Sequence, residues 1–161
     1  MTSQPYKLKV VIAFHYVEER LKYLKGVLES LSQFDDNYVI DVMVQTHQFG
    51  EGLAKLVNEY DPMCAFEVIG NLKDPYMLTW SHKARMETFL DSDYTHFIYL
   101  EDDMQLTQEN MEYWLETKDY FRSRNTDFIP AFVRVEYKNN GEAMAIDMKG
   151  PPTGIGVDFG D

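Results

Sequence analysis

Three consecutive carboxylates, Glu101, Asp102 and Asp103, stand directly after an apolar stretch in the segment THFIYLEDDMQLT, residues 95–107. Neighbouring like charges repel, and partly buried carboxylates need a cation or hydrogen-bond donors to compensate them. A bend at a strand end lets Glu101 and Asp103 converge on one hard cation, Mg²⁺ or Mn²⁺, and leaves Asp102 free to accept hydrogen bonds from sugar hydroxyls. The alternative is a solvated acidic turn that caps the following helix.

Aromatic and polar side chains follow the first two apolar runs of the chain. They are Phe14, His15 and Tyr16 after the first run, and Thr46, His47 and Gln48 after the second. An aromatic ring at such a place can stack on a nucleobase, while threonine and histidine donate and accept hydrogen bonds at its edge. Ordinary helix–sheet boundaries contain the same residue types, and His96, at the start of its strand, is interpreted as structural.

A positive charge precedes the acidic triplet. Arg85 lies 16 positions before Glu101, in the segment SHKARME with His82. A helix that leads into the strand of the triplet could offer this arginine to a diphosphate. The alternative is a surface arginine paired with Glu87.

The composition excludes several classes of function. Fifteen basic against 27 acidic residues give a net charge of −12, which disfavours binding to nucleic acid or to anionic membranes. Cys64 is the single cysteine, so neither a CxxC zinc motif nor an internal disulfide is possible. No Ser-His-Asp arrangement, Walker loop or GxGxxG is present. The apolar run from Val10 to Phe14 is too short for a signal peptide or a spanning helix, so we expect a soluble, cytoplasmic protein.

The elements that must position these residues alternate along the chain. Apolar, β-branched runs predict strands over residues 9–14, 37–46, 65–70 and 95–100. Amphipathic patterns predict helices over residues 17–34, 50–61, 77–93 and 108–124. This alternation predicts an α/β fold with three layers and a mostly parallel sheet, in which ligands bind beyond the carboxyl ends of the strands.

The last third of the chain has a different pattern. Two alternating runs flank Asn140-Gly141, which predicts an antiparallel hairpin added to the parallel sheet. Residues 149–161 are rich in glycine and proline and are interpreted as a loop. A length of 161 residues fits a single domain.

Several segments together resemble the GT-A nucleotide-sugar glycosyltransferases, especially their family 2-like group. KVVIAFHYVEERLKYLKGVLESL is similar to the opening of those enzymes, KAR (residues 83–85) to their AARN segment, and FIYLEDDM to their DXD motif in an EDD form. The hairpin FVRVEYKNNGEAMAI resembles the strands that follow. The resemblance spans residues 7 to about 148.

The resemblance implies a Rossmann-like GT-A fold and roles for particular residues. Asp103 would be the principal ligand of Mn²⁺ or Mg²⁺, and Glu101 a direct or water-mediated one. The implied nucleotide-sugar site consists of Asp102 facing the ribose, Tyr16 stacking on the base, Arg85 near the diphosphate, and Phe14, His15, Thr46 and His82. The partners would be a UDP- or GDP-linked sugar and an unidentified acceptor.

The chain also departs from the family. Gln45, Thr46 and His47 occupy the place of an aspartate that reads the base in many relatives, and Met86 follows Arg85 where asparagine is usual. The family's catalytic base and acceptor-binding elements lie well beyond the DXD motif. The chain therefore resembles a single donor-binding domain that lacks the acceptor-binding part, and no catalytic base is assigned.

Other functions remain open at this point. The main alternative is a non-catalytic, truncated GT-A-like domain that binds a nucleotide or a protein partner. A receiver-like signalling domain would need paired acids after the first strand, and a sugar nucleotidylyltransferase would need a Gly-rich loop there. Phe14, His15 and Tyr16 supply neither.

Overall fold

A computed structural model describes residues 4–128, 130–132, 134–137, 139, 141 and 143–145. The chain forms two compact units, Met1–Glu112 and Tyr113–Asp161. The elements of the first unit, in chain order, are β1 (Tyr6–Phe14), the 3₁₀ helix η1 (Glu18–Arg20), α1 (Leu21–Ser32), β2 (Tyr38–Thr46), α2 (Glu51–Asn58), β3 (Cys64–Val68), the 3₁₀ helix η2 (Pro75–Trp80), α3 (Ser81–Glu87) and β4 (His96–Glu101). Helix α4 (Gln108–Ser123) begins in the first unit and ends in the second.

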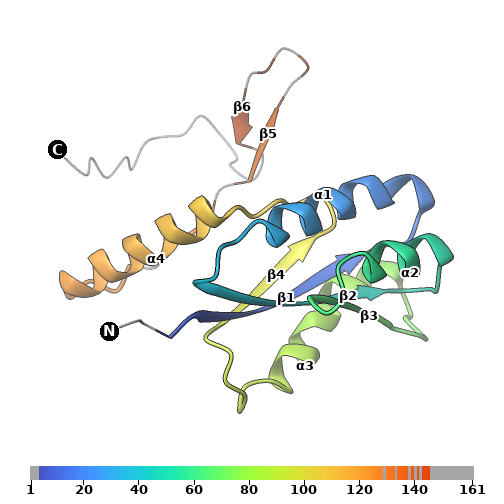
Figure 1. The fold of residues 1–161 in the computed structure, drawn as a ribbon, viewed down its shortest axis with the longest axis horizontal. Helices are drawn as coiled ribbons and strands as arrows, with labels where there is room; N and C mark the ends of the chain where they lie inside the picture. Colours follow the sequence, from blue (N-terminus) through green and yellow to red (C-terminus); the bar gives the residue numbers. More distant parts are fainter. Residues whose placement is uncertain are drawn as a thin grey trace. The chain divides into compact units, whose positions relative to one another are not determined.

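The first unit is built on a four-stranded sheet of order β3-β2-β1-β4, in which all neighbours are parallel. Helices α1 and α2 lie on one face of the sheet and α3 lies on the other (Figure 1). The predicted α/β architecture with a parallel sheet is therefore confirmed. The strand order reverses between β1 and β4, because the chain adds β2 and β3 on one side of β1 and then returns to its other side.

The core lies mainly between the sheet and α1. Residues 8–14 of β1 are all buried, as expected of a central parallel strand covered on both faces. The periodicity of this segment predicts an apolar stripe of Leu21, Leu24, Val27, Leu28 and Leu31; helix α1 buries the last four, and Leu21 at its start is half-buried. Burying each leucine or valine contributes about 1.5–3 kcal/mol, so this helix is held by packing.

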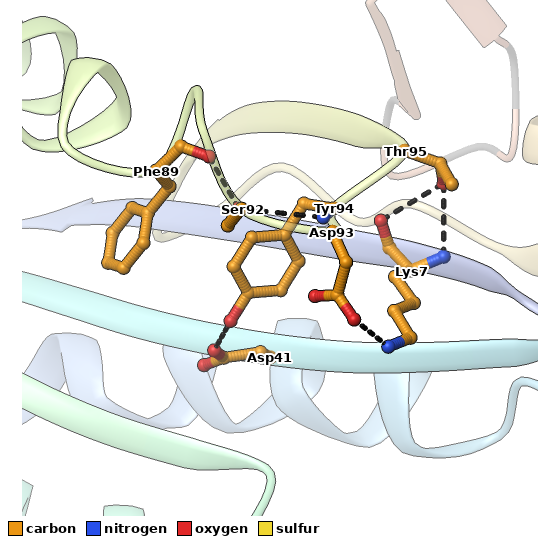
Figure 2. Close-up of polar contacts among 7 residues, drawn as sticks. All are labelled: Lys7, Asp41, Phe89, Ser92, Asp93, Tyr94 and Thr95. Carbon is orange, nitrogen blue, oxygen red and sulfur yellow. Dashed lines mark hydrogen bonds and ion pairs between the residues drawn. The ribbon is translucent and has the colours of Figure 1, made fainter.

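The face toward α3 is more polar. Lys9 of β1 has a side chain that is 3% exposed, and its Nζ lies 2.8 Å from Asp41 Oδ1 on β2. The Lys9 ammonium also lies 4.6 Å from the centre of the Phe89 ring. The Tyr94 hydroxyl donates a hydrogen bond to Asp41 (Figure 2). Lys9 is thus a buried cation whose compensation comes from β2 and from the segment before β4.

That segment differs from the helix predicted over residues 77–93. The first part is the 3₁₀ helix η2, α3 ends at Glu87, and the chain continues in turns to β4. The Lys7 amide donates to Thr95 Oγ1 at 3.0 Å, and Thr95 Oγ1 donates to the Lys7 carbonyl at 3.1 Å (Figure 2). The Thr95 amide also donates to the Lys7 carbonyl, at 2.8 Å. Within the predicted helix range, the Phe89 ring covers the Lys9 ammonium and Asp93 pairs with Lys7 of β1, so tertiary contacts override the local apolar pattern.

The second unit contains a short antiparallel pair, β5 (Val135–Tyr137) and β6 (Ala143–Ala145), in which Val135 faces Ala145. Gly141, between these strands, has a φ of +81°, which suits glycine in the predicted turn. In the described residues the pair forms a sheet of its own, so the predicted attachment to the parallel sheet is not confirmed. The glycine- and proline-rich tail, residues 149–161, lies outside the described residues.

Candidate functional site

The carboxyl ends of β1, β2 and β4 meet at one edge of the sheet. Ala13 of β1 is in register with Gln45 of β2 on one side and with Glu101 of β4 on the other. The residues that follow these strands therefore leave the sheet side by side. Because the strand order reverses between β1 and β4, this edge is the place at which open α/β sheets generally bind ligands.

The central carboxylate of the acidic triplet is held by an arginine from the start of the chain. Asp102 is 4% exposed. Arg20, at the end of η1, donates from Nε to Asp102 Oδ2 at 2.7 Å and from Nη2 to Asp102 Oδ1 at 2.9 Å. A third hydrogen bond runs from Arg20 Nη2 to Asp103 Oδ2 at 3.2 Å. These carboxylates raise the pKa of the Arg20 guanidinium, first through the hydrogen bond to Asp102. Both oxygens of Asp102, which was expected to be free for sugar hydroxyls, thus already accept hydrogen bonds from the protein itself.

The acidic triplet does not cap the following helix. The Asn110 amide donates to Thr107 Oγ1 and the Thr107 amide donates to Asn110 Oδ1, both at 3.2 Å. This reciprocal pair at the start of α4 is a capping box. The interpretation of the triplet as a helix cap is therefore wrong.

Glu101 and Asp103 are the remaining carboxylates of the triplet. Glu101 is half-buried, and the side chain of Asp103 is 40% exposed. In the described part of the chain, no group of three or more His, Cys, Asp or Glu side chains is arranged to hold a metal ion. A cation at this place would need further oxygen ligands from a bound molecule or from water.

Two histidines lie together where β1 and β2 end. The ring centres of His15 and His47 are 5.7 Å apart, and the Tyr76 ring of η2 lies 6.3 Å from His15. His15 Nε2 and His47 Nδ1 are buried and make no hydrogen bond to any described residue. Burial, followed by the charge of His15, lowers the pKa of His47. Unpartnered buried nitrogens of this kind are accounted for by a bound ligand or by water.

The other residues predicted at these strand ends are part of the protein's packing. Phe14 and Thr46 are fully buried, and Thr46 Oγ1 donates to the Gln48 carbonyl at 3.2 Å. Tyr16 donates from its hydroxyl to Glu18, and its ring lies so close to Gly50 that a Cβ there would be 2.0 Å from it. Tyr16 thus lies at the carboxyl-end edge of the sheet, but its ring packs against the loop before α2.

A chain of polar contacts joins α3 to β2 and β3. Ser81 Oγ donates to Gln45 Oε1 at 2.7 Å, and Gln45 Nε2 donates to Glu67 Oε2 at 3.3 Å. Arg85 Nε lies 3.5 Å from the same Glu67 oxygen and is buried without a hydrogen bond. Arg85 is therefore paired with Glu67, rather than with Glu87 as the structural alternative proposed.

His82 stacks on a tyrosine of the strand that leads to the triplet. The ring centres of His82 and Tyr99 are 4.1 Å apart, with an interplanar angle of 28°. The Tyr99 hydroxyl is buried without a hydrogen bond in the described residues. Burial, together with the charges of Glu101 and Asp102, raises the pKa of Tyr99 to about 12. Its hydroxyl is therefore a permanent hydrogen-bond donor at neutral pH.

Sequence reasoning missed Arg20 and Tyr99. Arg20 is 82 positions from Asp102, and no local pattern links a residue of the EER segment to the triplet. Tyr99 could have been found, because side chains two positions apart on a strand share a face and Glu101 was already a candidate.

A cavity of about 280 Å³ between α2 and β3, lined in part by Cys64, belongs to another part of the unit and includes none of the predicted residues.

Comparisons with known proteins add no relative: no protein-family model matches the chain, and neither does any curated protein. Across the part of the chain that the structure describes, no helix has both the length and the apolar character needed to cross a membrane.

Proposed function

We propose that this chain binds a nucleoside diphosphate sugar and is the donor-binding domain of a metal-dependent glycosyltransferase. The observation that carries the proposal is the position of the acidic triplet at the switch point of the parallel sheet, beside buried polar atoms without partners. Among those atoms are the free ring nitrogens of His15 and His47 and the hydroxyl of Tyr99. A ligand with both a polar base and an anionic group matches this set of donors and acceptors.

The residues present fit a hard divalent cation. Glu101 and Asp103 offer carboxylate oxygens, the ligands that Mg²⁺ and Mn²⁺ prefer. Two carboxylates are few for a closed site, but Mg²⁺ is commonly held by one or two carboxylates and the phosphates of the substrate. Such a cation would neutralise charge on a departing diphosphate.

The protein's own groups have distinct parts in this proposal. Arg20 neutralises Asp102 and limits the repulsion within the triplet, because both Asp102 and Asp103 accept its hydrogen bonds. The guanidinium of Arg85 is positioned for a phosphate if its 3.5 Å contact to Glu67 opens. Asp102, already paired, would contact a ribose only through the edge of its carboxylate that Arg20 leaves free.

Calorimetry with UDP-glucose, UDP-N-acetylglucosamine and GDP-mannose tests the proposal. Each donor is titrated with Mn²⁺ and with excess chelator into the wild type, Asp103→Asn and the control Asp91→Asn. The control removes the same charge from an exposed position between α3 and β4. We expect binding that needs Mn²⁺, that Asp103→Asn weakens at least about tenfold, and that Asp91→Asn leaves unchanged.

The outcomes separate the proposal from its alternative. Binding of the donor that persists in chelator and in Asp103→Asn would support a nucleotide-binding domain without metal-dependent transfer. If none of the three donors binds with or without Mn²⁺, the donor-binding proposal is wrong for this chain.

A further inference from the structure

The tautomer of His82 is set by its own helix turn. His82 Nδ1 lies 2.6 Å from the backbone carbonyl oxygen of Thr79. A carbonyl oxygen only accepts hydrogen bonds, so Nδ1 carries the ring proton. In the neutral imidazole the lone pair is then on Nε2, to which no described residue makes a hydrogen bond.

Two further contacts hold the His82 ring and the start of α3 in place. Tyr99 stacks on it from β4 with ring centres 4.1 Å apart, and Ser81, the preceding residue of α3, is anchored to Gln45 of β2. Tyr99 lies two residues before Glu101, which is about 6.6 Å along a strand with a rise of about 3.3 Å per residue. The His82 ring therefore lies against the residue of β4 that stands two positions before the acidic triplet begins.

A histidine with a fixed Nδ1 proton and a free Nε2 is equipped to accept a proton. Tyr99 is a positioning residue, which holds the imidazole plane by stacking, with ring centres 4.1 Å apart. Neither Glu101 nor Asp103 is free for the same task if both bind a cation.

We propose that His82 is the general base of the transfer reaction; this assignment rests on the proposed donor-binding function. His82 Nε2 takes the proton of the acceptor hydroxyl as its oxygen forms a bond to the anomeric carbon of the donor sugar. The bond from that carbon to the diphosphate breaks, and the nucleoside diphosphate leaves with the bonding electron pair. Sugar, proton and charge are balanced without a further reactant, and water can take the place of the acceptor.

Donor hydrolysis measures this step without knowledge of the acceptor. Release of UDP or GDP from UDP-glucose, UDP-N-acetylglucosamine and GDP-mannose is followed with Mn²⁺ for the wild type, His82→Ala and the control His96→Gln. The control removes a histidine from the opposite end of β4. General-base catalysis contributes about 10²–10⁴-fold, so we expect His82→Ala to lower kcat by at least about 100-fold. The donor Kd should change less than about threefold, because the proposed role of His82 is in proton transfer.

Added imidazole distinguishes a base from a merely structural ring. It should restore part of the lost rate to His82→Ala and leave the His96→Gln rate unchanged. If His82→Ala does not fold, His82→Gln takes its place, because its amide can keep the hydrogen bond to the Thr79 carbonyl but cannot take up a proton.

Three results would overturn the assignment. A rate within threefold of wild type in both His82 variants would do so, as would a loss of rate that imidazole does not restore. Metal-dependent donor binding without any release of nucleoside diphosphate by the wild type would also refute the base while leaving the donor-binding proposal intact. Absence of donor binding would instead remove the proposed function, and the base assignment with it.

Discussion

Replacing Arg20 by methionine should expose the electrostatic cost of the acidic triplet. The substitution keeps an apolar stem but removes both hydrogen bonds to Asp102, at 2.7 and 2.9 Å. The Asp102 side chain is 6% exposed, so the protein would be left with a carboxylate that water reaches poorly. A neighbouring negative charge on Asp103 adds repulsion.

The expected loss in the free energy of unfolding depends on how deeply the side chains of Arg20 and Asp102 are buried. Removing one partner of a fully buried ion pair costs about 3–5 kcal/mol. The Arg20 side chain is 37% exposed, so solvent can replace part of what it supplies, and we expect Arg20→Met to lower the free energy of unfolding by about 2–3 kcal/mol. Asp102→Asn keeps an acceptor for Arg20 and should cost about 1–2 kcal/mol. In the double variant no unpaired charge is buried, so Asp102→Asn should restore about 1 kcal/mol to Arg20→Met.

Urea denaturation followed by tryptophan fluorescence and circular dichroism measures these values. With an m-value of about 1–3 kcal/mol/M, Arg20→Met should lower the midpoint by about 0.7–3 M. Lys22→Met, an exposed position on α1, is the matched control and should stay within about 0.5 kcal/mol of wild type. The reasoning is refuted if Arg20→Met behaves like the control, or if Asp102→Asn destabilises the Arg20→Met protein further.

Two other predictions concern buried groups away from the site. Asp41→Ala should lower the free energy of unfolding, measured by urea denaturation, by about 3–5 kcal/mol, because the Lys9 side chain that it leaves unpaired is 3% exposed. Lys9→Met should stay within about 1 kcal/mol of wild type, since the Asp41 side chain is 39% exposed and keeps its hydrogen bond from Tyr94. Equal losses of stability in the two variants would contradict this prediction. Burial raises the pKa of Cys64 to about 12, so at pH 8 the native thiol should react with iodoacetamide at least about 100-fold more slowly than the thiol in urea. Because the folded pKa is the higher one, the contribution of Cys64 to stability is present below about pH 8.5 and falls as the pH rises toward 12, and urea titrations at pH 8 and 10 measure this loss.

The elements of the first unit could be read from local patterns with small errors at their ends. The β-branched run that predicts a strand over residues 9–14 is part of β1, and four of the five residues of the predicted helical stripe, all but Leu21, form the buried face of α1. These predictions succeed because the period of apolar residues depends only on which face of an element is buried. The helix predicted over residues 77–93 is α-helical only in α3: its start is the 3₁₀ helix η2, and after Glu87, Phe89 covers the Lys9 ammonium instead of continuing a helical face.

The sequence predicted where in the fold the candidate site residues lie, but only some of the contacts that they make. Parallel strands end at one edge, so the sequence by itself determined that the acidic triplet and the residues after Phe14 would lie near each other. It also determined the net charge and the presence of a single thiol, Cys64, because both are properties of residue type.

Only the tertiary structure decided which groups remain free at that edge. Arg20 reaches Asp102 across 82 positions, Arg85 is paired with Glu67 on β3, and the stacking of His82 on Tyr99 depends on how α3 packs against β4. Each of these contacts joins elements that are distant in sequence, and it forms only when strand order and register bring them together. A local pattern shows that a residue is polar, but its partner is set by the packing of the whole sheet.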